Sequence, residues 1–217
     1  RDADPDAAYL DGIHAVVTDT ALDPAYRALM LGLPSQSDLA TALHDAGETP
    51  DPDAIHAASE RMREAMATRF EDSAPALYLG NLVTAAYRPN AEQSGKRALA
   101  HAALSMVTRL HGDEMARQQF RAADNMTQQL AALANLIRAG KGDAALEKFE
   151  AQWKHDRLVM DKWFALQVAE AEPEDAADVA DRLTQHEAFN WKNPNRFRAV
   201  MGALAGHHAG FHHASGK

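Results

Sequence analysis

Start and stop signals for helices recur along this chain and constrain its fold more than any other feature. An Asp-Pro pair occurs at Asp4-Pro5, Asp23-Pro24 and Asp51-Pro52. Aspartate accepts hydrogen bonds from the free N–H groups of a first helical turn, and proline at the first helical position gives up a donor that has no partner there. Glycines that suit a left-handed helix end follow apolar stretches at Gly47, Gly112 and Gly140. The chain is therefore predicted to consist of many short helices.

The spacing of apolar residues gives the same result. Between Ala98 and Leu110 they recur at intervals of three and four, which places one apolar stripe on a helix face. No segment shows the strict alternation of a half-buried strand. We therefore predict an all-α fold with helices at roughly 5–18, 24–31, 36–46, 52–71, 74–87, 91–111, 113–122, 125–139, 143–155, 157–171, 173–187, 194–204 and 207–214.

The connections between these helices are short, so consecutive helices are expected to pack as antiparallel pairs. No sequence repeat of fixed period is visible, which argues against a tetratricopeptide array. The predicted architecture is an irregular, superhelical, α-solenoid-like stack. One domain should cover residues 1–217, and the loop Glu48–Asp53 is the weakest joint, which could set apart a small N-terminal helical segment at 1–48.

Charge and composition exclude several classes of protein. The chain carries a net charge of −9 and has no run of Lys or Arg, so nucleic acid is not expected as a partner. No apolar run approaches the roughly 20 residues that cross a bilayer, and the polar N-terminus does not resemble a signal peptide, so no membrane partner is expected. There is no cysteine, which favours a cytoplasmic location. Because the chain opens without Met and stops at Gly216-Lys217, we expect a fragment of a longer protein.

A search for catalytic chemistry finds no complete motif. A helical zinc site of the peptidase type needs two His four residues apart with a Glu after the first, and in His186–Asn190 an Asn stands where the second His is required. There is no Gly-x-Ser-x-Gly elbow and no Gly-rich phosphate loop. A C-terminal group of histidines could bind a metal by its spacing, but no Asp or Glu lies close to orient the rings: His207, His208, His212 and His213. We therefore expect no catalytic residue and no metal site in this chain.

Two segments rich in aromatic and basic residues stand out. The first holds Trp163 and Phe164, which are more often core residues than ligand platforms because each buries a large area. The second is Asn193–Arg198, a predicted helix entry. Its two guanidinium groups, on Arg196 and Arg198, should point in different directions, so that at most one need be solvated.

Several motifs in the chain resemble bacterial aminopeptidase N, the alanyl aminopeptidase of the gluzincin class. The resemblance covers nearly the whole chain and is carried, in order, by Leu22–Ala25, Leu33–Ser35, Asp51–Ile55, Ala122–Thr127 with Leu130–Leu133, Leu158–Gln167, Asn193–Arg196 with Arg198, and Gly202–Gly206. It implies the C-terminal helical domain of a four-domain enzyme that removes N-terminal residues from peptides with a zinc-activated water.

In such an enzyme the zinc ligands lie in a thermolysin-like catalytic domain that precedes this region, so zinc belongs to the parent enzyme and the fragment alone should be inactive. The resemblance further implies that the helical domain encloses the active-site chamber and controls peptide access. Its expected partners are the catalytic domain of the same polypeptide and peptide substrates. Arg198, with Arg196 as second choice, is expected to face the chamber, because an Arg fork pairs with a peptide carboxylate through two parallel hydrogen bonds.

The sequence departs from the family at His207-His208, where small polar residues are more common, and it stops where family members continue through further helices. Two other functions remain open. An independent helical-repeat adaptor would bind a protein partner in its groove. A His-rich module would bind nickel or zinc.

Overall fold

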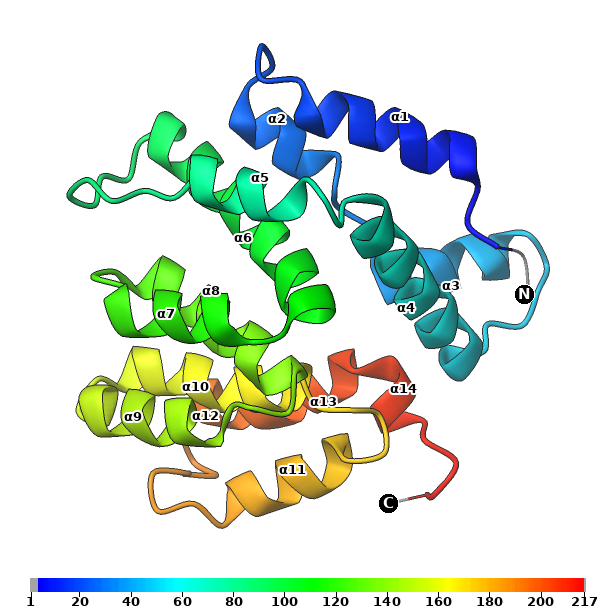
Figure 1. Cartoon of the computed structure of the whole chain (residues 1–217). Coiled ribbons are helices and arrows are strands. Elements are labelled where there is room, and N and C mark those ends of the chain that lie inside the picture. The colour runs from blue at the N-terminus through cyan, green and yellow to red at the C-terminus, as the bar shows by residue number, and fades with distance from the viewer. Residues whose placement is uncertain (1–3, 217) are drawn as a thin grey trace. The chain divides into compact units, whose positions relative to one another are not determined.

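The computed structural model describes residues 4–216, and within that range it contains helices and no strand (Figure 1). The all-α prediction is therefore confirmed. The elements in chain order are α1 (Ala7–Thr18), α2 (Pro24–Leu29), α3 (Gln36–Asp45), α4 (Pro52–Arg69), α5 (Ala74–Gly80), α6 (Ala91–His111), α7 (Glu114–Ala122), α8 (Met126–Arg138), α9 (Asp143–Trp153), α10 (Arg157–Ala169), α11 (Ala176–Thr184), α12 (Pro194–Phe197), the π-helical turn η1 (Arg198–Gly202), α13 (Ala203–Gly206) and α14 (His208–Phe211).

Two compact units make up the chain. The first is the described part of Arg1–Pro50 together with Ala54–Asn135, and the second is Asp51–Asp53 with the described part of Leu136–Lys217. One boundary falls inside α8, between Asn135 and Leu136, and two others, Pro50/Asp51 and Asp53/Ala54, fall at the loop Glu48–Asp53 that the sequence suggested as the weakest joint. The described residues before 48 share a unit with α5 to α7, and a separate N-terminal segment stays a prediction. Periodicity could not indicate a boundary inside α8, because the apolar spacing runs unbroken through that helix.

The start and stop signals act largely as predicted. Asp23 caps α2, since its Oδ1 accepts from two N–H groups of the first turn. The chain takes a left-handed conformation at the three expected glycines, with φ values of 80°, 86° and 65° at Gly47, Gly112 and Gly140. At the N-terminus the prediction needs a correction: Asp6, and not Asp4, accepts from the first turn, so α1 begins two residues later than expected.

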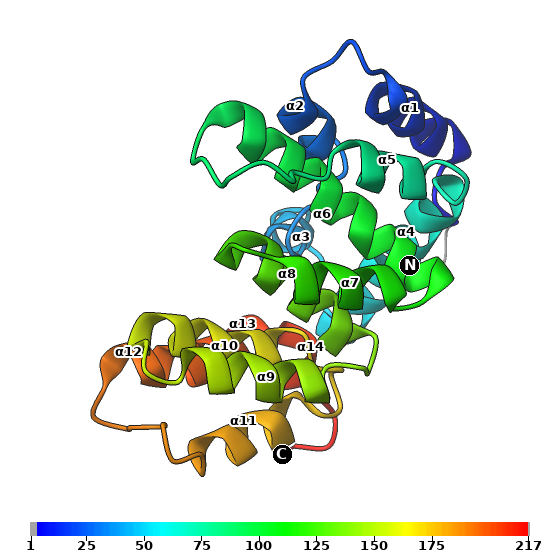
Figure 2. The same ribbon diagram turned by 60° about the vertical axis from the view of Figure 1, so that its left-hand side comes forward.

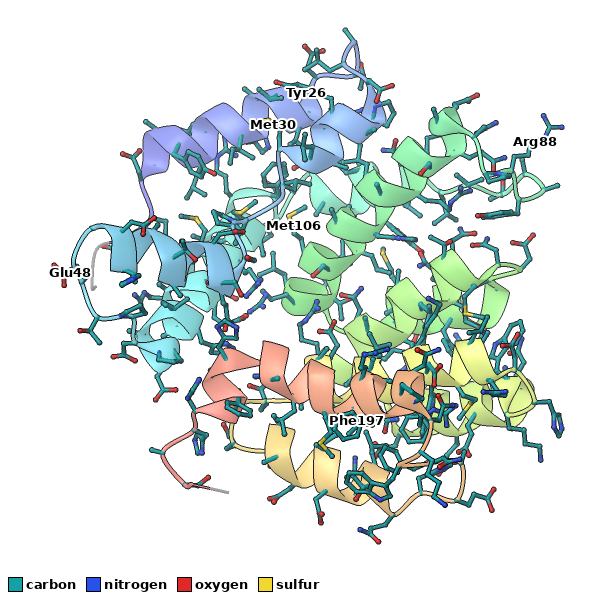
Figure 3. All side chains as sticks on the ribbon, turned by 180° about the vertical axis from the view of Figure 1, so that it is seen from behind. Tyr26, Met30, Glu48, Arg88, Met106 and Phe197 are labelled. Atoms are coloured by element: carbon teal, nitrogen blue, oxygen red, sulfur yellow. The ribbon has the colours of Figure 1, made fainter. Side chains whose placement is uncertain are left out.

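A larger correction concerns the helix predicted at 74–87, which ends at Gly80. Asn81 Nδ2 donates to Leu77 O at 2.8 Å and so occupies a carbonyl of the last turn. The segment that follows is a loop held by α6: the Arg97 guanidinium lies 4.6 Å from the centre of the Tyr87 ring and donates to Arg88 O at 3.2 Å. Arg88 marks the outer end of this loop in Figure 3. Contacts with Arg97 of the next helix, nine residues after Arg88, thus override the local helical tendency.

Helix α6 is the centre of the first unit and packs against α2, α5 and α7. Its predicted stripe is buried, with Leu99 and Ala103 fully inaccessible and Val107 1% exposed. The approach of α2 is unusually close at Gly95, where an added Cβ would lie 2.9 Å from the backbone N of Ala25. A residue without a side chain is therefore required at this crossing.

Helix α10 has the same role in the second unit, where it packs against α9, α11, α12, η1 and α13 (Figure 2). The prediction that Trp163 and Phe164 belong to the core is confirmed, with 5% and 0% of each residue exposed. The indole Nε1–H of Trp163 donates to Leu146 O on α9 at 3.1 Å, and the two aromatic rings meet edge to face at 5.0 Å. Burial of both rings therefore fixes α10 against its neighbours.

The last part of the chain is less regular than predicted. The helix expected at 194–204 is interrupted by η1, in which the hydrogen-bonding pattern widens to a π turn between α12 and α13. The helix expected at 173–187 is confined to 176–184, and the one expected at 207–214 is the single turn 208–211. The spacing of apolar residues in the sequence does not reveal a π turn, because the extra residue interrupts the regular helical period.

Candidate functional site: a mounted arginine pair on the second unit

The segment from Asn193 to Arg198 is built as a helix entry. Asn193 Oδ1 accepts from the N–H of Asn195 at 3.1 Å and from that of Arg196 at 3.4 Å, and Pro194 occupies the first helical position. These are the capping interactions that Asn-Pro favours. The cap fixes the direction in which the next side chains leave the backbone.

Arg196 points inward and is 4% exposed. Its Nε–H donates to Asp161 Oδ1 on α10 at 2.6 Å, and its guanidinium carbon lies 4.5 Å from the centre of the Phe164 ring. The terminal nitrogens donate to two backbone carbonyls, Ala188 O and Arg157 O. A buried guanidinium with these partners is satisfied internally, and removing one partner of such a pair typically costs about 3–5 kcal/mol.

These contacts join two segments that are far apart in the sequence. Asp161 belongs to Leu158–Gln167, and Arg196 belongs to Asn193–Arg196, two of the motifs that carried the family resemblance. The Asp161–Arg196 ion pair therefore links α10 to the entry of α12. Sequence reasoning did not foresee it, because the partners are separated by 35 positions and neither residue indicates the other.

Arg198 has the opposite environment. It is exposed and is the first residue of η1. Within residues 4–216 the only hydrogen bond of its guanidinium is a long one, 3.4 Å from Nη1 to Asn195 Oδ1. The two arginines thus leave the helix in different directions, as their spacing predicted, and only Arg198 has a cation available to a ligand.

Exposed aromatic rings lie beside this pair, and sequence reasoning did not single them out. Trp191 is 59% exposed and Phe197 is 41% exposed, with their ring centres 6.0 Å apart. Phe197 is labelled on α12 in Figure 3. Phe189 stands between Trp191 and the buried Phe164, at 5.0 and 6.1 Å, so a row of rings runs from the core to the surface. The sequence signal that could have indicated these rings is the pair Phe189 and Trp191, two aromatic residues at alternate positions just before Asn193-Pro194.

The residues around His186 do not fit a zinc site. His186 Nε2 lies 3.0 Å from Glu150 Oε1, while its Nδ1 accepts from the N–H of Ala188 at 3.1 Å, so both ring nitrogens are engaged. The ring also packs against Trp163 and Phe164. Across the described residues 4–216, no three His, Cys, Asp or Glu side chains come together in a way that could hold a metal.

The C-terminal histidines serve the local fold. His207 Nδ1 accepts from the N–H of Gly210 at 3.1 Å, which leaves Nε2–H to donate to Ala171 O at 2.9 Å. The ring therefore caps α14 and ties it to the end of α10. His213 Nδ1 contacts Ser215 Oγ at 3.0 Å.

A groove of about 220 Å³ in the first unit also combines apolar and charged groups. Its lining includes Met66 and Met106, with Arg63 and Arg109 among its charged residues. Both arginines contact the same carboxylate, Glu60, at 2.5 and 2.7 Å. The charges of this groove are therefore already paired, unlike the charge of Arg198.

Between residues 4 and 216, no helix combines the length and the apolarity that crossing a bilayer requires.

Comparison with known proteins identifies the chain's relatives. It is 36% identical over 214 residues to aminopeptidase N of Caulobacter vibrioides, an alignment that covers 96% of this chain and 24% of that protein. It is 36% identical over 210 residues to aminopeptidase N of Escherichia coli, with 94% of this chain and 23% of that protein covered. The chain thus spans about a quarter of the length of the curated relatives it matches.

Among solved structures, the chain resembles the aminopeptidase A of Legionella pneumophila that was crystallised in complex with aspartic acid. The TM-score is 0.81 at 23% identity, and the match covers 96% of this chain and 25% of that one. The fold is therefore shared. All 217 residues match the family described as a domain of unknown function with ARM repeats, DUF3458_C. The chain therefore belongs to the DUF3458_C family of ARM-repeat domains, and over nearly its whole length it is similar to a quarter of aminopeptidase N.

Proposed function

We propose that this chain is the noncatalytic C-terminal helical domain of a cytoplasmic zinc aminopeptidase, and that it encloses the active-site chamber and controls the access of peptides. One observation carries the proposal: more than nine-tenths of the chain aligns with about a quarter of aminopeptidase N at 36% identity. The catalytic zinc then belongs to the remainder of the polypeptide. No step through the metal is assigned to this chain, since its residues do not fit a zinc site.

Arg198 is the residue of this domain best suited to hold substrate. A peptide bound by its N-terminus at a distant metal extends carbonyl groups and a C-terminal carboxylate into the chamber. The exposed guanidinium of Arg198 can meet that carboxylate with two parallel hydrogen bonds. Arg196 does not take this role in the proposal, because Asp161, two carbonyls and the Phe164 ring already surround its guanidinium.

The role of Arg198 is tested in the full-length aminopeptidase that carries this domain. Charge-assisted hydrogen bonds contribute about 1.5–3 kcal/mol, so Arg198→Ala should raise KM for di- and tripeptides by roughly ten- to a hundredfold. Because the contact is remote from the scissile bond, kcat should change little. Single-residue amide substrates lack the carboxylate and should be spared. Equal effects on both substrate types would exclude a carboxylate contact.

Access control has a separate test. The intact enzyme should remove the N-terminal residue of a short peptide, but it should fail on the same peptide fused to the N-terminus of a small, stably folded protein. Unfolding the fused protein by truncation should restore cleavage. Equal rates on the folded and unfolded fusions would contradict an enclosed chamber.

A further inference from the structure

The environment of Arg196 has a consequence for Arg198. Its guanidinium is held on four sides, by the Asp161 carboxylate, by two backbone carbonyls and by the face of the Phe164 ring. Phe164 itself is fully buried, and the Asp161 side chain is 18% exposed. The Arg196 guanidinium is therefore held against the core of the second unit.

The backbone on either side of Arg196 is also fixed. Asn193 caps the helix entry before it, and Val200, which is fully inaccessible, lies in the π turn that follows and packs on α10 and α11. Arg198 lies between these two attachment points, as the first residue of η1. Single π turns inside helices are frequently found at functional sites.

We infer that Arg196 is a positioning residue: with Asp161, Phe164 and the π turn it forms a rigid mount that fixes the direction of the Arg198 guanidinium. The inference rests on the proposed function of Arg198 and explains how an exposed, flexible side chain can recognise a carboxylate with two hydrogen bonds. Side chains with many rotamers lose entropy when they bind. A fixed backbone under Arg198 avoids an additional loss of backbone entropy, and the bond to Asn195 Oδ1 limits the rotamers of the side chain itself.

The choice of arginine at 196 follows from the same geometry. A guanidinium is planar and presents donors in a fixed fork, so it can donate to Asp161, Ala188 O and Arg157 O while its face stacks on a ring. The ammonium group of a lysine has no flat face and cannot keep this set of directions. Arg196→Lys should therefore preserve the buried charge but loosen the mount.

The experiment uses the full-length aminopeptidase with Arg196→Lys, which keeps the buried charge, and with the isosteric Asp161→Asn, which changes the other partner of the pair, as a second variant in case the first fails to fold. Each variant should raise KM for free-carboxylate dipeptides by roughly tenfold, the effect of losing one of two parallel hydrogen bonds. kcat and KM for a single-residue amide should stay unchanged. Combined with Arg198→Ala, neither variant should raise KM further, because the group it positions is already gone.

Arg97→Lys is the matched control. Arg97 is also 4% exposed and also stacks on an aromatic ring, that of Tyr87, but it lies in the first unit. This variant should lower thermal stability and leave the dipeptide KM unchanged.

Two results would overturn the inference. One is a loss of stability in Arg196→Lys and Asp161→Asn with an unchanged dipeptide KM. The other is KM effects that multiply with that of Arg198→Ala. In either case the role of Arg198 stands if Arg198→Ala alone raises the dipeptide KM, whereas no effect of Arg198→Ala refutes the proposed contact itself.

Discussion

Replacing Trp163 by alanine tests how the second unit is held together. The indole is 5% exposed, donates to Leu146 O, and contacts the rings of Phe164 and His186 at 5.0 and 5.2 Å. Truncating a buried Trp typically costs about 3–5 kcal/mol, because burial is lost and a cavity remains. The edge-to-face contact with Phe164 accounts for about 0.5–1.5 kcal/mol of such a loss. We expect Trp163→Ala to lie in the upper half of that range.

The assay is chemical and thermal unfolding of the chain, followed by circular dichroism at 222 nm. A change of 1 kcal/mol shifts Tm by about 2–8 °C over the size range of ordinary domains, so a loss of at least about 4 kcal/mol should lower the melting temperature by at least about 8 °C. Trp163→Phe keeps most of the ring but removes the N–H donor, and should cost about 1–2 kcal/mol.

Trp191→Ala is the control within the same unit. With 59% of the residue exposed, it should cost less than about 1 kcal/mol. A Trp163→Ala chain that melts like the wild type would refute the reasoning, and so would a larger effect of Trp191→Ala than of Trp163→Ala.

The remaining predictions concern activity, packing and pH. The isolated chain should not hydrolyse alanine-linked chromogenic substrates with or without zinc, and chelator-sensitive hydrolysis that survives purification would contradict this. Gly95→Ala should destabilise by about 1–3 kcal/mol in urea unfolding because its Cβ would meet Ala25, whereas Gly12→Ala, with nothing within 4 Å, should stabilise by up to about 1 kcal/mol. Burial, with a smaller effect of Arg97, lowers the pKa of His101 to about 4 from 6.5. The unfolded chain then binds more protons, so stability should fall by up to about 3 kcal/mol as pH drops from 6.5 to 4, and His101→Gln should flatten this dependence.

The parts of the fold that follow from local rules were predictable from the sequence. Asp23 caps α2 because an aspartate before a proline accepts hydrogen bonds from the free N–H groups of the first turn. Trp163 is buried because its indole carries a large apolar surface. The divergence of Arg196 and Arg198 also follows from helical spacing alone. Whether Arg198 contacts a peptide stays a prediction.

The parts that depend on contacts between elements were not predictable. The loop after α5 is held by Arg97 of α6, which stacks on Tyr87 and donates to Arg88 O, and the spacing of apolar residues does not indicate these contacts. The partner of Arg196 likewise lies on α10, at Asp161. The comparisons confirm the resemblance to aminopeptidase N, but a shared motif does not say which of its residues are anchors and which are exposed.

The π turn at Arg198–Gly202 also affects how relatives are aligned, because the number of residues in this segment shows whether the turn is present. A turn closed by i→i+5 bonds holds about one residue more than an α turn. A relative that lacks one residue here can keep a continuous, regular helix with the side chains after the gap in nearly the same directions, because the π turn accommodates the extra residue. An alignment that places such a gap in a neighbouring loop would instead equate residues whose side chains differ in direction by about 100° around the axis. The position of the gap therefore separates relatives that retain the π turn at Arg198 from those that have lost it.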